Sequence, residues 1–103
     1  MVTFHCTQKA RRRFGLEANA PVDPTGRLGN WYANLLNVGS GRWVVCISER
    51  SLLPVLLPAR NTEFPTRFPS YLDRVLEGIG VPPSVAERES STCAEWTVAK
   101  TED

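Results

Sequence analysis

The chain has 103 residues, of which 42% are hydrophobic and 22% charged, a balance typical of one globular domain spanning 1–103 rather than a disordered chain. Its formal net charge of only +1 argues against a strongly basic nucleic-acid-binding protein. No apolar run approaches the ~20 residues of a membrane helix, and the first residues do not read as a secretory signal, so we expect a cytoplasmic protein.

The first predicted elements are a strand and a short basic helix. Residues 2–6, VTFHC, have the β-branched and aromatic character of a strand. Thr7 can cap a helix through its hydroxyl oxygen, and Gly15 is the residue type that commonly ends one in a left-handed conformation. The sequence therefore predicts a helix over 8–14, followed by a loop rich in Pro, Gly, Asn and Asp.

Two apolar segments, 31–38 and 42–48, are predicted to form a hairpin around Gly39-Ser40-Gly41. Alternation along each strand leaves neither face cleanly polar, so we expect both faces to be partly covered. Trp31 and Trp43 are interpreted as buried cross-strand partners rather than as a platform on which bases stack.

The second half of the chain begins with an edge strand and continues with a long helix. Residues 52–58 read as a strand, and Pro54 places it at a sheet edge. From Phe68 to Ile79 the apolar residues follow a helical stripe, with Pro69 in the first turn. The loop 60–66 separates the two elements. SVAERES, after Pro82-Pro83, adds one helical turn, and 93–100 alternates as a final strand.

These elements predict an α+β fold. Their order along the chain is β-α-β-β-β-α-β. We expect a small antiparallel sheet with two helices packed mainly on one face.

Three segments of the chain resemble an uncharacterised family of small bacterial proteins, a domain of unknown function. They are FHCTQKA at 4–10, LGNWYANLL at 28–36 and the apolar helix near 68–79. The most specific piece is G-x-W-x-A-N-L-L, which here begins at Gly29. The resemblance implies this fold and no known activity. It also implies that relatives continue beyond Lys100-Thr101 into a further polar stretch and a helix.

The basic helix is the first candidate site. Residues 1–30 are net basic and residues 84–103 net acidic, so the molecule is a possible dipole with one basic patch. Guanidinium groups bind phosphate and acidic partners. Arg12 and Arg13 are predicted to project away or sideways from the helix, so that replacing both with Gln should change the free energy of unfolding by less than about 1 kcal/mol. The candidate residues for a partner or a phosphate group are Lys9, Arg11, Arg12 and Arg13.

A second candidate is a polar site at His5 and Asn34, because both are polar residues inside predicted strands. His5 and Cys6 point to opposite faces of one strand, so they cannot form a nucleophile-base pair within it. His5 would meet Cys46 or Cys93 only across strands.

We predict no metal and no cofactor. The three cysteines lack a C-x-x-C pair, and their odd number and wide spacing indicate reduced, buried thiols.

The sequence contains no recognisable phosphate-binding, nucleophile-elbow or metalloprotease motif. We therefore expect a non-catalytic bacterial domain that binds a protein partner. The alternative is a nucleic-acid binder that uses residues 9–13. A third possibility is a small enzyme with a site near His5, Asn34 and Cys46. The oligomeric state is left open.

Overall fold

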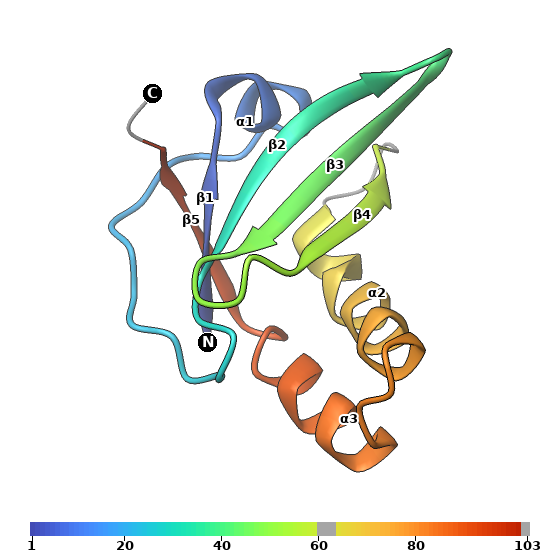
Figure 1. Cartoon of the computed structure of the whole chain (residues 1–103). Helices are drawn as coiled ribbons and strands as arrows, with labels where there is room; N and C mark the ends of the chain where they lie inside the picture. Colours follow the sequence, from blue (N-terminus) through green and yellow to red (C-terminus); the bar gives the residue numbers. More distant parts are fainter. Residues whose placement is uncertain (60–63, 102–103) are drawn as a thin grey trace.

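The chain folds into one sheet with its helices on one side (Figure 1). The computed structural model describes residues 1–59 and 64–101. Within these residues the elements are β1 (Val2–Cys6), α1 (Gln8–Phe14), β2 (Trp31–Val38), β3 (Gly41–Ser48), β4 (Pro54–Pro58), α2 (Phe64–Gly78), α3 (Pro83–Ser91) and β5 (Trp96–Lys100). The predicted α+β class and order are confirmed, with α3 as an additional helix.

The sheet is mixed, so the prediction of an antiparallel sheet was wrong. The strand order is β4-β3-β2-β1-β5, and the central β1 runs parallel to both β2 and β5. The pairs β2-β3 and β3-β4 are antiparallel. Parallel neighbours need a connection of about a dozen residues or more. The segment from 7 to 30 provides one between β1 and β2, and the helices α2 and α3 lie in the other.

Helix α1 has the two ends that the sequence predicts. The Oγ1 of Thr7 accepts a hydrogen bond from the backbone N–H of Ala10 at 3.3 Å. Gly15 adopts a φ of 65°, a left-handed conformation in which a side chain would be strained. Ala10 is fully buried, so the helix packs against the sheet through the predicted face.

The hairpin register places the two tryptophans on opposite faces of the sheet. Trp31 lies opposite Ser48, whereas Trp43 lies opposite Leu36. Trp31 is 0% exposed and packs on Phe68, with ring centroids 4.8 Å apart. Trp43 is 37% exposed. The prediction that both are buried cross-strand partners was therefore wrong, because the register decides which face each strand residue occupies.

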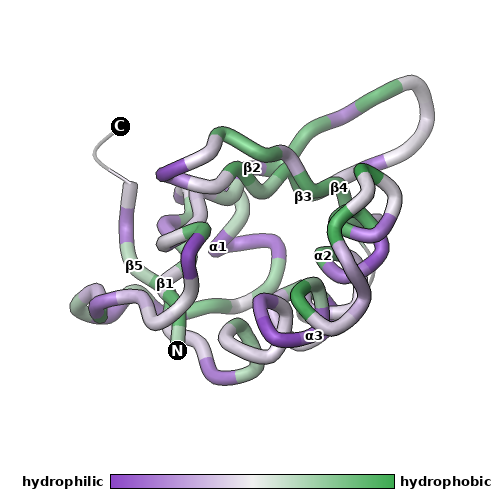
Figure 2. Tube along the Cα trace, turned by 60° about the horizontal axis from the view of Figure 1, so that its bottom comes forward, coloured by the Kyte–Doolittle hydropathy of each residue, from purple (hydrophilic) through white to green (hydrophobic). Residues whose placement is uncertain are grey.

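The core lies between one face of the sheet and the helices. Figure 2 shows α2 and α3 together on one side of β2, β3 and β4. The ring of Phe4 on β1 meets the rings of Phe64 and Phe68 on α2 edge to face, at centroid distances of 5.3 and 5.0 Å.

Helix α2 differs in detail from the prediction. It includes Phe64 and Pro65, residues assigned in advance to the loop 60–66; residues 60–63 of that loop lie outside the described residues. Pro69 consequently sits inside the helix rather than in its first turn. Ile79, the last residue of the predicted stripe, is exposed because it follows the helix end.

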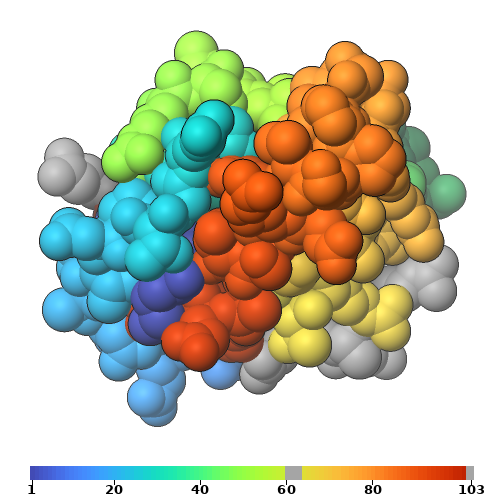
Figure 3. All heavy atoms as spheres, turned by 90° about the horizontal axis from the view of Figure 1, so that it is seen from below, coloured from blue at the N-terminus to red at the C-terminus, as the bar shows by residue number. Residues whose placement is uncertain are grey.

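The segment from 15 to 30 runs along the β5-β1 end of the sheet and then beside α3. Figure 3 shows this segment, in blue to cyan, against α3 and the start of β5, in orange to red. The Asn30 side chain fixes it: its Oδ1 accepts from Thr3 N at 2.9 Å, and its Nδ2 donates to Val22 O at 3.1 Å. The backbone N–H of Leu28 donates to Glu89 Oε1 of α3 at 2.9 Å. The segment therefore covers one end of the sheet's second face.

Candidate functional site

The face of the sheet opposite the helices is uncovered over β2, β3 and β4, and its residues are mostly apolar. Solvent-facing strands commonly carry polar residues at these alternate positions. Here Tyr32 is 48% exposed, Leu36 42% and Leu56 52%. The residues of this surface, which we name the open face, are Tyr32, Asn34, Leu36, Val38, Trp43, Val45, Ile47 and Leu56. Exposed apolar clusters of this kind mark binding surfaces.

The open face contains two shallow hollows that meet at Leu36. One, of about 320 Å³, is lined by Thr7, Tyr32, Ala33, Asn34, Leu36, Val45, Ile47 and Thr101. The other, of about 270 Å³, is lined by Leu36, Val38, Trp43 and Leu56. The hydropathy colouring of Figure 2 shows apolar stretches on the strands that form these hollows. The surface is therefore indented as well as apolar, so side chains of another molecule can enter it.

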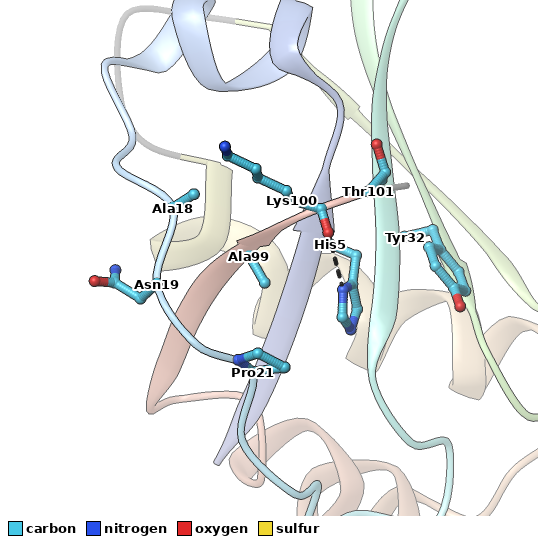
Figure 4. Close-up of a pocket in the computed structure, with 8 residues that line it drawn as sticks. All are labelled: His5, Ala18, Asn19, Pro21, Tyr32, Ala99, Lys100 and Thr101. Atoms are coloured by element: carbon cyan, nitrogen blue, oxygen red, sulfur yellow. Dashed lines mark hydrogen bonds between the residues drawn. The ribbon is translucent and has the colours of Figure 1, made fainter. Parts of the chain in front are cut away.

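A more polar cleft of about 560 Å³ adjoins the open face at Tyr32 (Figure 4). The rings of His5 and Tyr32 come from the neighbouring strands β1 and β2, with centroids 5.4 Å apart. The Nδ1 of His5 lies 3.5 Å from the backbone oxygen of Lys100. The cleft is lined by His5, Ala18, Asn19, Pro21, Tyr32, Ala99, Lys100 and Thr101. It offers hydrogen-bonding groups next to an apolar surface.

The two residues of the predicted polar site lie on the same face of the sheet. His5 pairs in register with Tyr32, and Asn34 lies two residues further along β2. The Oδ1 of Asn34 accepts hydrogen bonds from Thr7 Oγ1 at 3.0 Å and from Leu35 N at 2.8 Å. Asn34 therefore lies on the open face and His5 beside it, and the Asn34 oxygen is already hydrogen-bonded within the chain.

The cysteines lie on the other side of the sheet. Cys6, Cys46 and Cys93 are buried in the core with the residues that contact the helices, whereas His5 alternates to the opposite face. The sheet thus separates the histidine from the thiols, which argues against the enzyme site proposed from His5, Asn34 and Cys46. Within residues 1–59 and 64–101, no group of three or more His, Cys, Asp or Glu side chains is arranged to hold a metal ion.

Burial also makes these thiols poor nucleophiles. Desolvation raises the pKa of Cys6 from its ordinary value of 9.0 to about 12, although the nearby Arg11 guanidinium acts in the opposite direction. Burial likewise raises the pKa of Cys93 to about 11, and it raises the pKa of Cys46 well above the usual range.

We expect slow reaction of all three thiols with iodoacetamide at pH 8 in the native protein and rapid reaction in urea. Thiol counting by mass spectrometry checks this, and fast native labelling of Cys46 would contradict it.

The same pKa shifts predict that alkali destabilises the fold. The folded state holds the Cys6 and Cys93 protons up to a pKa of about 12 and 11, whereas the unfolded state releases them near 9.0. Between these values the unfolded state binds fewer protons, so the free energy of unfolding falls as the pH rises. Urea unfolding at pH 8 and pH 10 measures the difference. In the double variant Cys6→Ala, Cys93→Ala, the free energy of unfolding should decrease less between pH 8 and pH 10 than it does in the wild type.

The basic helix is divided between exposed and partly buried side chains. Lys9 and Arg12 are exposed, whereas Arg11 and Arg13 are partly buried. Arg13 Nη2 donates to the backbone oxygen of Ala59 at 3.2 Å, and its guanidinium lies 5.4 Å from the centre of the Phe14 ring. Arg13, which the sequence led us to expect away from the sheet or sideways, is thus partly buried and contacts Ala59 and Phe14. The structure leaves two of the four candidate cations fully available to a partner.

This division predicts different stability effects for two neighbouring arginines. Arg12→Gln should change the free energy of unfolding by less than about 0.5 kcal/mol, as at other surface sites. Arg13→Gln should cost about 1 kcal/mol, because it removes a hydrogen bond to Ala59 and the contact with Phe14. Urea unfolding of the two variants side by side measures this. Equal effects would show that the Arg13 contacts add no stability.

Leu36, Trp43 and Leu56 are site residues that sequence reasoning missed. The available signal was the strand alternation combined with the register of the hairpin. In the structure the turn contains two residues, Gly39 and Ser40, because Val38 pairs with Gly41. That register places Trp43 and Leu36 side by side on one face of the sheet. From the sequence we expected this face to be partly covered by other parts of the chain.

Comparison with known proteins identifies a family without an assigned activity. The model of a family described as "Domain of unknown function (DUF6933)" matches residues 3–103. No curated protein and no solved structure gives a significant match. In the part of the chain that the structure describes, no helix is both long enough and apolar enough to cross a membrane.

Proposed function

As the chain belongs to the DUF6933 family of domains of unknown function, we propose from its geometry that it is a non-catalytic bacterial domain that binds a protein partner through the open face. The observation that carries this proposal is the exposure of Tyr32, Leu36, Val38, Trp43 and Leu56 on one uncovered sheet face. Aromatic and aliphatic side chains arranged in this way lose contact with water when a protein covers them, which favours association.

The chemistry of the polar cleft supports binding more than catalysis. The cleft is lined by the His5 imidazole, the Tyr32 phenol and Lys100, while the thiols that could serve as nucleophiles are buried on the far side of the sheet. A nucleophile needs a positioned base within hydrogen-bonding reach. The cleft is better suited to form part of the polar rim of a protein interface. In such an interface, hydrogen-bonding groups surround an apolar centre, which here would be the open face.

The basic helix is the weaker surface for a partner. Its exposed cations are Lys9 and Arg12, and the whole chain carries a net charge of only +1. Nucleic-acid binding relies on several phosphate contacts made by such cations. We therefore retain nucleic-acid binding through residues 9–13 as an outcome for the experiment to exclude.

We also propose that the domain is cytoplasmic. Three free, buried cysteines of odd number support a reducing compartment, in which structural disulfides are rare. Mass spectrometry of protein isolated from its native host under acid quench checks this. Three reduced thiols are the expected result, and a mixed disulfide at any of them would contradict the placement.

The binding experiment compares the immobilised wild type and three variants, each exposed to lysate of the host. Leu36→Lys introduces a charge into the centre of the open face. Ile79→Lys introduces the same charge at an exposed apolar residue outside the open face and serves as the matched control. Arg12→Gln removes one exposed cation of the basic helix.

We expect one or more proteins to bind the wild type, Ile79→Lys and Arg12→Gln equally, and to be reduced at least about 10-fold on Leu36→Lys. Mass spectrometry with stable-isotope quantification measures the ratios. Equal capture by Leu36→Lys would overturn the proposal. Recovery of nucleic acid that declines with Arg12→Gln would favour the nucleic-acid alternative instead.

A further inference from the structure

The open face has the properties of a surface that binds its own copy, and we propose that its partner is a second copy of this chain in a symmetric face-to-face dimer. This inference rests on the proposed function, since it requires that the open face binds protein. In a twofold dimer the same patch contributes from both subunits. Such a patch has to be compatible with itself in charge, in hydrogen bonding and in shape.

The first requirement is the absence of like charges. None of the eight residues of the open face is Asp, Glu, Lys or Arg. A net charge on a self-complementary patch would face its own sign across the interface, which disfavours association. The helical side of the molecule is different, because it exposes charged residues such as Arg67, Arg74, Glu77 and Arg88. Two open faces can therefore meet without repulsion between like charges. An uncharged surface also does not attract a charged partner over an uncharged one.

The second requirement is that the polar groups can satisfy one another. The hydrogen-bonding groups of the open face are the Tyr32 hydroxyl and the Asn34 amide, which can each donate and accept, and the Trp43 indole N–H, which can only donate. The Asn34 oxygen is engaged by Thr7 and Leu35, and its NH2 group has no hydrogen-bond partner among the described residues. That NH2 can donate to the Tyr32 hydroxyl of a second copy. A charged partner is not needed to satisfy this face.

The third requirement is shape. Two sheets pack face to face about 10 Å apart when their side chains interdigitate. The open face contains the hollows of about 320 and 270 Å³, and Leu36 lines both of them. Trp43 borders the smaller hollow, and a tryptophan in this position is the residue type that most often anchors a protein interface. Leu36 and Trp43 of one copy can therefore enter the hollows of the other.

The test is the oligomeric state of three purified proteins: wild type, Leu36→Lys and the control Ile79→Lys. Sedimentation equilibrium over a range of concentrations gives the dimer dissociation constant, and urea unfolding verifies that each variant is folded. We expect dimers for the wild type and Ile79→Lys, and at least about a 100-fold weaker dimer for Leu36→Lys, since each dimer would contain two added charges in an apolar contact. The wild-type constant should be insensitive to salt, because screening acts on charged contacts.

Several outcomes would overturn the dimer. One is a wild-type protein that stays monomeric up to about 1 mM; another is a dimer unaffected by Leu36→Lys. The lysate experiment then separates the two proposals. A monomer whose capture of another protein is lost in Leu36→Lys contradicts the dimer and leaves the binding function of the open face in place. A monomer whose capture is unchanged in Leu36→Lys contradicts both.

Discussion

Replacing Trp31 with alanine is expected to lower the free energy of unfolding by about 3–5 kcal/mol, the range for large aromatic residues removed from a packed core. Trp31 is 0% exposed, and its ring packs edge to face on Phe68, which in turn packs on Phe4. The substitution would leave a cavity where the central sheet meets α2. Urea unfolding followed by far-UV circular dichroism measures the change, because that signal does not depend on the tryptophan removed.

Trp43→Ala is the matched control for this prediction. Trp43 lies on the adjacent strand with its side chain on the open face, 37% exposed. At a protein concentration low enough for the chain to be monomeric, we expect its removal to cost less than about 1 kcal/mol, as at other partly exposed sites. A loss for Trp43→Ala as large as that for Trp31→Ala would contradict the assignment of the two residues to opposite faces. It would also remove the support for a binding surface at Trp43.

Replacing Asn30 with alanine is expected to cost about 2–3 kcal/mol. Its Oδ1 accepts from the backbone N–H of Thr3, which is buried in β1 next to the point where the β2 ladder begins. The side chain of Asn30 thus extends the hydrogen bonding of the sheet by one residue. Its Nδ2 also holds the covering segment through Val22 O. Alanine would leave the buried Thr3 N–H without an acceptor.

The control for Asn30 is Asn19→Ala. Asn19 belongs to the same connecting segment but is exposed, and its Nδ2 donates to the backbone oxygen of Glu17 at 3.3 Å. Its replacement should change the free energy of unfolding by less than about 0.5 kcal/mol. Urea unfolding of both variants, with hydrogen exchange of the Thr3 amide as a local probe, measures the difference. Equal small effects would show that Asn30 is dispensable to the sheet.

The elements of this protein were largely predictable because their signals are local. Thr7 and Gly15 fix the ends of α1 through hydrogen bonds and a backbone conformation that involve only nearby residues. Whichever strand β4 pairs with, its prolines indicate that it lies at the edge of the sheet, because proline has no N–H to donate to a second neighbouring strand. The helical stripe of Phe68, Leu72 and Leu76 likewise requires only a period of 3.6 residues.

Part of the candidate site followed from the same local patterns. His5 and Asn34 stood out as polar residues in apolar strands, and the structure places Asn34 on the open face and His5 beside it. The apolar residues of that face were misjudged as covered. An exposed leucine such as Leu36 has the same sequence signal as a buried one such as Leu35, its neighbour in the strand. What distinguishes them is whether a helix lies over their side of the sheet.

The sequence by itself determined the α+β class, the bounds of β1 and α1, the edge position of β4 and the hairpin, because each depends on short-range backbone and side-chain chemistry. The tertiary structure decided that β1 is the central strand, parallel to both neighbours, because strand pairing across long connections leaves no local trace. It also decided which face the helices cover. The helices α1, α2 and α3 lie on the Trp31 side. On the Trp43 side the segment 15–30 covers only the β1-β5 end, so in the described residues the surface over β2, β3 and β4 remains available for binding.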